Sequence, residues 1–253
     1  MRIATFNVQN LRLRTQEGQT LLDAATDDDA SEPARSAALA HADRIETAKV
    51  IAAARADVVA LQEVFDIETL DFFHDRYLLP AGSTVYDHRY CLKGNDGRGL
   101  NVAALSKERA NIVRSYADKT GADLGLSDLD DELRDNPIFR RDCLELDFDS
   151  VTVFICHFKA PYPQPARAFA VRAAEARAAR RIIEARFAKP ERERWILLGD
   201  FNEPFSAKER VESALDVLGD GFAVDLRTRQ KPGRGWTYEI PHNHLHTRPD
   251  RIL

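Results

Sequence analysis

Cysteine is scarce in this sequence. Only three of the 253 residues are cysteines, namely Cys91, Cys143 and Cys156. An odd number without closely spaced pairs fits neither a disulfide framework nor a zinc site with paired cysteine ligands. The sequence therefore predicts three reduced and mostly buried thiols.

Long hydrophobic runs, flexible linkers and internal repeats are also missing. No apolar stretch is long enough to span a bilayer, and the chain opens on a strand-like pattern instead of a charged and then apolar signal segment. No segment rich in Pro, Gly or Ser divides the chain near its middle. With 44% hydrophobic and 30% charged residues, the composition predicts one globular domain over residues 1–253 and the cytoplasm as its location.

An excess of positive charge is the third thing that the chain lacks. The net charge is −5, which argues against broad nonspecific adhesion to nucleic acid. A negative net charge is compatible with a local basic groove, because a metal ion and a few arginines are sufficient to bind phosphate in an acidic protein.

What the chain does contain is a series of short apolar runs that end in polar side chains. Such runs are typical of buried strands, and reactive groups of sheet proteins collect where strands emerge at one rim. The runs are residues 3–7 ending in Asn7, 58–63 ending in Glu63, 153–157 ending in His157, and 195–202 ending in Asp200 and Asn202. This set suits Mg²⁺ and a phosphate ester, because Mg²⁺ prefers a few carboxylate oxygens and leaves room for water and substrate oxygens.

The segments between these strands predict a layered arrangement. Residues 14–42 are polar and acidic without a sustained period, which predicts a surface insertion, and Asp43 resembles a helix N-cap with Glu46 three residues on. Hairpins are expected over residues 82–110 and about 144–156, and a long amphipathic helix over 167–187. Antiparallel hairpins mixed with two crossover helices favour an α/β sandwich over a purely parallel sheet.

The candidate site residues differ in how strongly each points to chemistry. Asn7 alone is a common turn former, and Glu63 at a strand mouth is either a metal ligand or a solvated carboxylate. Strand alternation would place Asp200 and Asn202 on one face, where one takes a proton from water and the other donates to a phosphoryl oxygen. Taken alone, His157 indicates a core histidine. Beside strand-end carboxylates, however, it is expected to interact with a phosphate group.

Other polar residues give weaker signals. A group of histidines has metal-like spacing but lacks an obvious fourth ligand, so zinc is not favoured: His242, His244 and His246. Arg98, Arg140 and Arg141 lie near the predicted hairpin rims and are better candidates for phosphate contacts.

An ordered set of motifs covers nearly the whole chain. The motifs are Thr5-Phe6-Asn7-Val8-Gln9-Asn10-Leu11, Leu61-Gln62-Glu63-Val64, Gly97-Arg98-Gly99-Leu100-Asn101-Val102-Ala103-Ala104-Leu105-Ser106, Cys156-His157-Phe158-Lys159, Gly199-Asp200-Phe201-Asn202 and Pro249-Asp250-Arg251-Ile252-Leu253. Each motif is weak alone, but in this order they resemble the endonuclease/exonuclease/phosphatase family, which includes pancreatic-type deoxyribonuclease and abasic-site endonucleases. The resemblance implies a four-layer α/β/β/α sandwich of two mixed β-sheets flanked by helices.

The resemblance also implies roles for the strand-end residues. Glu63 would hold Mg²⁺ or Mn²⁺ with support from Asn7, and Asp200 would orient or deprotonate the attacking water. Asn202 and His157 would grip the phosphate, and the attack would be in line without a covalent enzyme intermediate.

Further residues follow from the same resemblance. Asp250 would belong to the catalytic set, and Arg98, Asn101 and Arg141 are candidates for phosphate binding. Family members carry one more strand with a Ser-Asp-His motif, whereas no histidine follows Asp250 here. The expectation is a shortened form or the loss of a catalytic group, with His244 or His246 as a less favoured substitute.

These observations leave three functions in competition. The first is a metal-dependent phosphodiesterase that acts on nucleic acid, with no preference between DNA and RNA indicated. The second is a phosphatase or sphingomyelinase-like hydrolase of a phosphorylated small molecule or lipid. The third is a noncatalytic module that binds phosphate or nucleic acid.

Overall fold

The structure is a computed structural model that describes residues 1–16, 18–24, 33–203, 212–219, 221–229, 235–240 and 243–253. The chain divides into two compact units, Met1–Asn111 and Ile112–Leu253. Each unit is described by itself, and the expectation of a single domain over residues 1–253 stays a prediction.

A mixed four-stranded sheet forms the centre of the first unit, in the order β1-β4-β6-β5. Its strands are β1 (Ile3–Leu11), β4 (Val58–Val64), β6 (Asn101–Ser106) and β5 (His88–Cys91). Strand β1 runs parallel to β4, with Asn7 opposite Gln62, and the other two pairings are antiparallel. The parallel pairing places Asn7 beside the carboxyl-terminal part of β4. Strand β1 continues past Asn7 to Leu11, with a shift of register in between, so the strand does not end at Asn7 as expected.

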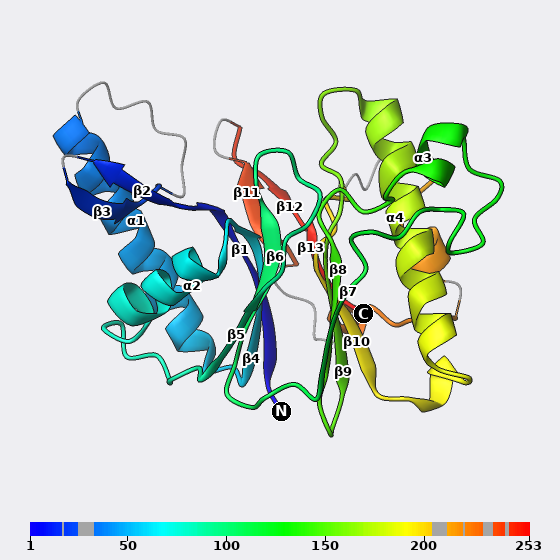
Figure 1. The fold of residues 1–253 in the computed structure, drawn as a ribbon, viewed down its shortest axis with the longest axis horizontal. Coiled ribbons are helices and arrows are strands. Elements are labelled where there is room, and N and C mark those ends of the chain that lie inside the picture. The colour runs from blue at the N-terminus through cyan, green and yellow to red at the C-terminus, as the bar shows by residue number, and fades with distance from the viewer. Residues whose placement is uncertain (17, 25–32, 204–211, 220, 230–234, 241–242) are drawn as a thin grey trace. The chain divides into compact units, whose positions relative to one another are not determined.

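Helices cover one face of the first sheet (Figure 1). They are α1 (Pro33–Ala54), α2 (Ile67–Phe73) and the π-helical turn η1 (His74–Leu78). Ile51 of α1 and Phe73 of α2 pack into one core cluster with Leu61 of β4. A separate antiparallel hairpin consists of β2 (Leu13–Gln16) and β3 (Gln19–Leu22).

The second unit has a mixed five-stranded sheet in the order β13-β10-β9-β8-β7. Its strands are β13 (Asp250–Ile252), β10 (Trp195–Asp200), β9 (Thr152–His157), β8 (Cys143–Asp147) and β7 (Ile112–Ser115). Strands β9 and β10 are parallel, whereas the other pairings are antiparallel. The carboxyl ends of β9 and β10 therefore lie side by side, next to the first residue of β13.

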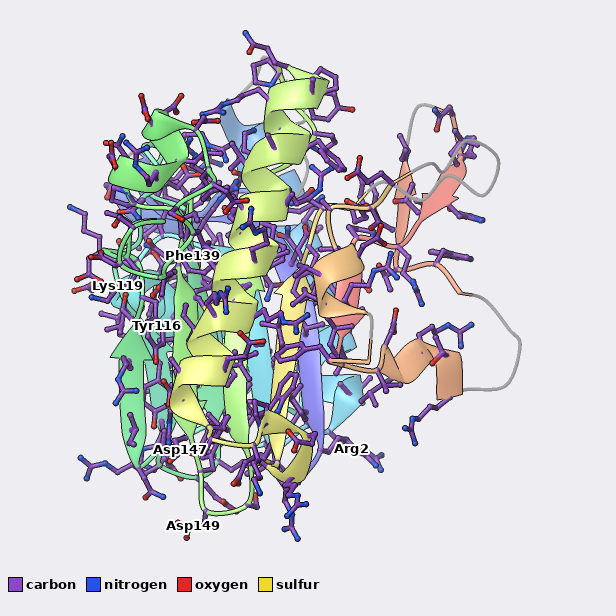
Figure 2. The ribbon with its side chains drawn as sticks, turned by 90° about the vertical axis from the view of Figure 1, so that its right-hand side faces the viewer. Arg2, Tyr116, Lys119, Phe139, Asp147 and Asp149 are labelled. Carbon is purple, nitrogen blue, oxygen red and sulfur yellow. The ribbon has the colours of Figure 1, made fainter. Side chains whose placement is uncertain are left out.

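Helix α4 (Pro165–Arg186) lies along one face of the second sheet, with Tyr116 and Phe139 on the same side (Figure 2). Its buried positions include Val171, Ala178 and Ile182, which belong to the core cluster of this unit. The shorter elements are α3 (Asp131–Asp135), η2 (Pro190–Arg192), η3 (Asp216–Leu218), η4 (Leu226–Arg229) and the hairpin of β11 (Tyr238–Ile240) with β12 (Leu245–Thr247).

Two expectations about the first third of the chain are wrong. Asp43 does not cap a helix, because α1 begins at Pro33 and Asp43 lies in its interior. The segment 14–42 is not merely an irregular insertion, since it holds most of the β2–β3 hairpin and the first turns of α1. Residues 25–32 of that segment lie outside the described part of the chain. Alanine has the highest helix propensity, and the alanines that precede Asp43 allow the helix to start earlier.

Other expectations are confirmed. Both hairpins form, as β5–β6 and β8–β9, and α4 covers the expected range. All three cysteines are free thiols, with Cys143 and Cys156 buried. Among the residues that the structure describes, no helix combines the length and apolar character needed to cross a membrane.

Candidate functional site

In the first unit, Asn7 in the middle of β1 meets Glu63 near the carboxyl end of β4. The Asn7 side-chain Nδ2 donates to Glu63 Oε1 at 3.1 Å, and the backbone N of Asn10 donates to Glu63 Oε2 at 3.1 Å. Each carboxylate oxygen thus receives a donor that fixes its direction and keeps further lone pairs. The structure thus brings two of the predicted site residues together, and their role in holding a metal ion stays a prediction.

A tight turn after Asn7 makes this contact possible. Gln9, Asn10 and Glu63 all adopt positive φ angles, of 48°, 48° and 68°. Arg44 of α1 is fully buried and donates to the carbonyl oxygens of the turn, including Gln9 O at 2.7 Å. Burial lowers the pKa of Arg44 to about 10, which still leaves the guanidinium charged at neutral pH. The buried guanidinium of Arg44 therefore fixes the backbone turn that carries Asn10.

The donor chemistry of this corner fits a small hard cation. Mg²⁺ is commonly held by one or two carboxylates together with water and phosphate oxygens. Glu63 offers one oriented carboxylate, and Asn7 is the residue that orients it. Within the described residues no group of three or more His, Cys, Asp or Glu side chains could hold a metal ion, so a closed protein cage is not part of this arrangement.

In the second unit, strand register brings three predicted residues together. Asp200 on β10 lies opposite His157 on β9 and opposite Asp250 on β13. His157 Nε2 is 3.8 Å from Asp200 Oδ2, and both side chains are buried. Two carboxylates and an imidazole thus share one end of the sheet, an arrangement suited to moving a proton to or from water.

Asp250 is one of the two carboxyl groups of this trio, and its two oxygens have different surroundings. Its Oδ2 accepts a hydrogen bond from the Thr237 hydroxyl at 2.6 Å, whereas its Oδ1 is buried without a hydrogen-bond partner in the described residues. Burial raises the pKa of Asp250, against the opposing effect of the Thr237 hydrogen bond. An orphaned buried carboxylate oxygen costs free energy unless something binds it.

Asn202 reaches the site in a different way from the one expected. Strand β10 ends at Asp200, and Asn202 has a φ of 51°, so the alternation of a strand does not extend to it. Its backbone N donates to Asp200 Oδ1 at 2.9 Å, and its side-chain Nδ2 donates to Phe158 O at 3.0 Å. Asn202 therefore ties the ends of β9 and β10 together within hydrogen-bond reach of Asp200.

The candidates for phosphate binding are dispersed and differ in environment. Arg98 is exposed and pairs with Asp96 at 3.1 Å. Asn101 is buried, and its amide bonds to Phe65 O and Gly94 N. Arg141 is buried in the second unit with Phe158 O at 3.5 Å. Asn101 thus has a structural task in its own hairpin, and a phosphate role for these residues remains a prediction.

The histidine group does not form a metal centre in the described residues. His244 Nδ1 lies 2.6 Å from Glu239 Oε1, and His246 Nε2 lies 3.3 Å from Glu239 Oε2. Both histidines are exposed on the β11–β12 hairpin, and His246 stacks on Trp236 with ring centroids 4.3 Å apart. His242 lies outside the described part of the chain.

Two residues near the candidate sites escaped the sequence analysis. Arg44 holds the turn after Asn7, and Thr237 donates to Asp250. An arginine at a buried helical position, in step with Ala48 and Ile51, is a sequence signal for Arg44. Thr237 gives no such signal, because its contact joins residues 13 positions apart through a hairpin.

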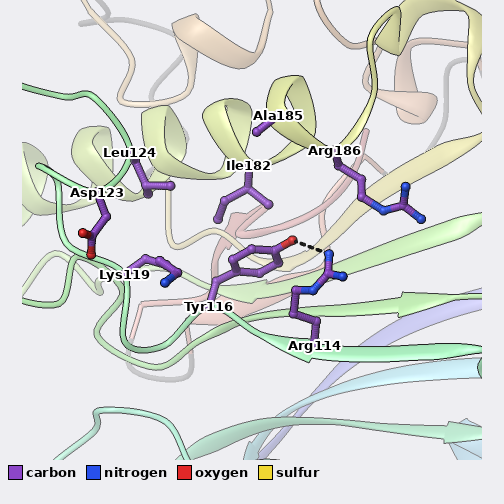
Figure 3. A pocket seen from close by; sticks show the side chains of 8 residues that line it. All are labelled: Arg114, Tyr116, Lys119, Asp123, Leu124, Ile182, Ala185 and Arg186. Atoms are coloured by element: carbon purple, nitrogen blue, oxygen red, sulfur yellow. Dashed lines mark hydrogen bonds between the residues drawn. The ribbon is translucent and has the colours of Figure 1, made fainter.

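A cavity of about 560 Å³ lies elsewhere in the second unit (Figure 3). Its lining residues are Arg114, Tyr116, Lys119, Asp123, Leu124, Ile182, Ala185 and Arg186. Arg114 and Arg186 both bond to the fully buried Glu145, at 3.0 and 2.9 Å. The cavity is at the β7 edge, and β8 separates that edge from β9. Its arginines are engaged by a buried carboxylate, so the candidate site lies at the ends of β9 and β10 instead.

Known proteins resemble this chain in sequence pattern and in fold. The sequence profile described as "Endonuclease/Exonuclease/phosphatase family" matches residues 4–253. No curated protein matches the sequence. A humanized D. rerio TDP2 has 17% sequence identity and a TM-score of 0.54, over 100% of this chain and 82% of that chain.

Two bacterial structures are similar in the same measure. An endonuclease/exonuclease/phosphatase family protein from Leptotrichia buccalis C-1013-b has 17% identity and a TM-score of 0.56, over 100% of this chain and 86% of that chain. A functionally unknown conserved protein from Enterococcus faecalis V583 has 18% identity and a TM-score of 0.53, with the same coverage. At these identities the likeness shows the fold, and the predicted α/β class with two mixed sheets and flanking helices is confirmed.

Proposed function

We propose that this chain, which belongs to the endonuclease/exonuclease/phosphatase family, is a divalent-metal-dependent phosphodiester hydrolase with nucleic acid as its substrate. Family membership supports a phosphoesterase of the phosphodiesterase or nuclease type. The metal, the diester substrate and a cytoplasmic location are the finer parts of the proposal.

One observation carries the proposal. The register of β9, β10 and β13 sets Asp200 between His157 and Asp250 at one sheet end. Burying polar side chains in a sheet core lowers the stability of the fold. Their convergence at a strand end therefore favours a catalytic role over a stabilising one. Hydrolysis of a phosphate ester needs groups that accept and donate protons at such a place.

The residues of the second unit divide the reaction between them. Asp200 takes the proton of the attacking water, and its Oδ1 is held by the backbone N of Asn202. His157, 3.8 Å from Asp200, faces the phosphate oxygens as a donor. Asp250 lies beside Asp200 and accepts a hydrogen bond from Thr237. The raised pKa of Asp250 limits the negative charge that stands next to Asp200.

The residues of the first unit hold the cation. Glu63 supplies the carboxylate, and Asn7 and Asn10 fix its direction. When bound, Mg²⁺ or Mn²⁺ supplies Lewis-acid polarisation of a phosphoryl oxygen. Calorimetry with Mg²⁺ tests this part: Glu63→Gln is expected to lose most of the affinity, whereas the exposed Glu108→Gln keeps it. Equal affinity in the Glu63 variant and the parent contradicts the metal assignment.

A turnover assay tests the catalytic part. Purified parent chain is assayed with Mg²⁺ on single- and double-stranded oligonucleotides, bis-p-nitrophenyl phosphate and p-nitrophenyl phosphate. We expect diester cleavage that Asp200→Asn lowers about 10²-fold or more, with the exposed Asp149→Asn as a control of the same chemistry. Preferential cleavage of the monoester favours a phosphatase, and phosphate or oligonucleotide binding without any cleavage favours the noncatalytic module.

A further inference from the structure

Phe158 and Lys159 directly follow His157. The backbone N–H and C=O groups of both residues are hydrogen-bonded, either to the end of β10 and the residues after it or to side chains of α4. Phe158 N donates to Asp200 O at 2.9 Å, and Phe158 O accepts from Asn202 Nδ2 at 3.0 Å. Lys159 N donates to Glu175 Oε2 at 2.6 Å, and Lys159 O accepts from Arg172 Nη1 at 3.0 Å. The chain after β9 is therefore fixed between the end of β10 and helix α4.

Glu175 is one of the two anchors on α4. Its side chain is fully buried, and its Oε1 also accepts from the backbone N of Arg140 at 2.9 Å. Burial raises the pKa of Glu175 to about 7 despite these two backbone donors. Burial of a carboxyl group in such surroundings lowers the free energy of unfolding. Packing alone does not offset this loss, which indicates that Glu175 has another role on α4.

Arg172 is the second anchor, one helical turn before Glu175. Its Nε donates to Glu203 Oε2 at 2.8 Å while its Nη1 holds Lys159 O. The other oxygen of Glu203 accepts from the Ser213 hydroxyl at 2.6 Å and from Ala214 N at 3.1 Å. One guanidinium thus links the segment after His157 to the residue after Asn202.

A buried ion pair of this kind is weak evidence for stability. The desolvation of two charges offsets most of their attraction, and apolar side chains of similar volume are often as stable. A forked guanidinium does offer fixed directions, because it reaches two acceptors at once in a plane, which an ammonium group cannot do. Arg172 therefore gives geometry to two loops at the same time.

From these contacts we propose that Arg172 is a positioning residue of the hydrolytic site. Through Lys159 O and Glu203 it sets the distance between the loops that carry His157 and Asn202, without reaching the phosphate itself. This inference rests on the proposed function, since positioning matters only where His157 and Asn202 act. A displacement of about 1 Å in such groups can lower turnover about 10²-fold.

The test replaces Arg172 by lysine, which keeps the charge and loses the fork. Arg172→Lys is expected to lower kcat on bis-p-nitrophenyl phosphate about 10- to 100-fold, with KM changed less than about threefold. Arg180→Lys is the matched control, because Arg180 lies on α4 and also bonds a carboxylate and a carbonyl, Glu184 at 2.7 Å and Val217 O at 2.9 Å. The control is expected to keep parental kcat, since neither partner belongs to the segment after His157 or to the segment after Asp200.

A spectroscopic arm separates this inference from the proposed function. The chain has seven histidines, and the imidazole signal of His157 can be assigned in a ¹³C-histidine spectrum by its loss in His157→Gln. Arg172→Lys is expected to shift that signal, whereas Arg180→Lys leaves it in place. A parent chain that hydrolyses nothing refutes the proposed function while this arm still reports on positioning.

Two results would overturn the inference. One is an Arg172→Lys protein with parental kcat and an unmoved His157 signal. The other is a loss of kcat that matches the fraction unfolded in a urea titration, which would make the role structural. If Arg172→Lys does not fold, Glu203→Asp keeps the charge and shortens the side chain by one methylene, so that Arg172 and residue 203 no longer span the same distance. The same kcat loss is then expected from that variant, and parental turnover in it contradicts the proposal.

Discussion

Gly199 lies beside two of the proposed catalytic residues, and its replacement by alanine gives a sharp test of the proposed site. It pairs with Cys156 of β9 and precedes Asp200. Its φ is 141°, and a Cβ built there would lie 1.9 Å from the Cys156 carbonyl oxygen. Since real Cβ atoms do not approach a backbone oxygen that closely, Gly199→Ala must push β9 and β10 apart beside Asp200 and His157.

The cost follows from two contributions. A side chain at such a φ costs about 1–3 kcal/mol, and forced overpacking costs about another 1–3 kcal/mol. We therefore expect Gly199→Ala to lower the free energy of unfolding by about 2–6 kcal/mol. For a chain of this length that corresponds to a decrease in Tm of roughly 4–24 °C.

Urea unfolding and diester turnover measure the two effects. Gly97→Ala is the matched control, because an added Cβ there meets nothing within 4 Å and its φ is not positive. The control is expected to stay within about 0.5 kcal/mol of the parent. Below the unfolding transition, Gly199→Ala should also lose turnover. A folded Gly199→Ala protein with parental stability and turnover would refute the close packing of β9 against β10.

Two further predictions concern stability. Burial raises the pKa of Asp142 to about 6 from the ordinary 3.8, so the unfolded chain releases this proton at lower pH than the folded chain. Between about pH 4 and 7 this group lowers the unfolding free energy by up to about 3 kcal/mol; Asp142→Asn should flatten that decline in urea titrations at the two pH values, and an unchanged slope contradicts it. Asp66 accepts from Thr69 N at 2.8 Å as the N-cap of α2. Asp66→Ala should cost about 1 kcal/mol in the same titration and Asp66→Asn much less, whereas equal losses would exclude a capping role.

A local pattern was sufficient for the long helix of the second unit. The apolar positions Val171, Ala174, Ala178 and Ile182 predict the buried face of α4, and all four are buried. Helical periodicity reports burial directly, because one face of a helix must leave water. The start of α1 was missed for the opposite reason: a cap signal at Asp43 was weighed above the helix propensity of the preceding alanines.

The candidate site residues show what the sequence could determine and what it could not. By itself the sequence determined that Glu63, His157 and Asp200 lie at or next to the carboxyl ends of strands, since apolar runs that stop at a polar residue mark where a strand leaves the core. The same pattern failed for Asn7, because β1 continues to Leu11. It could not determine the position of Asn202, because the backbone leaves the extended region there and strand alternation no longer applies.

Only the tertiary structure decided which distant groups hold the site in shape. Arg44 and Arg172 look in sequence like any charged residue of a helix, yet each is buried and donates to carbonyl oxygens of a functional loop. Thr237 meets Asp250 across a hairpin. These contacts join residues far apart in the chain and depend on side-chain direction and burial, which no local spacing specifies. Sequence determined the elements and the chemistry at their ends, and packing determined the backbone geometry that orients that chemistry.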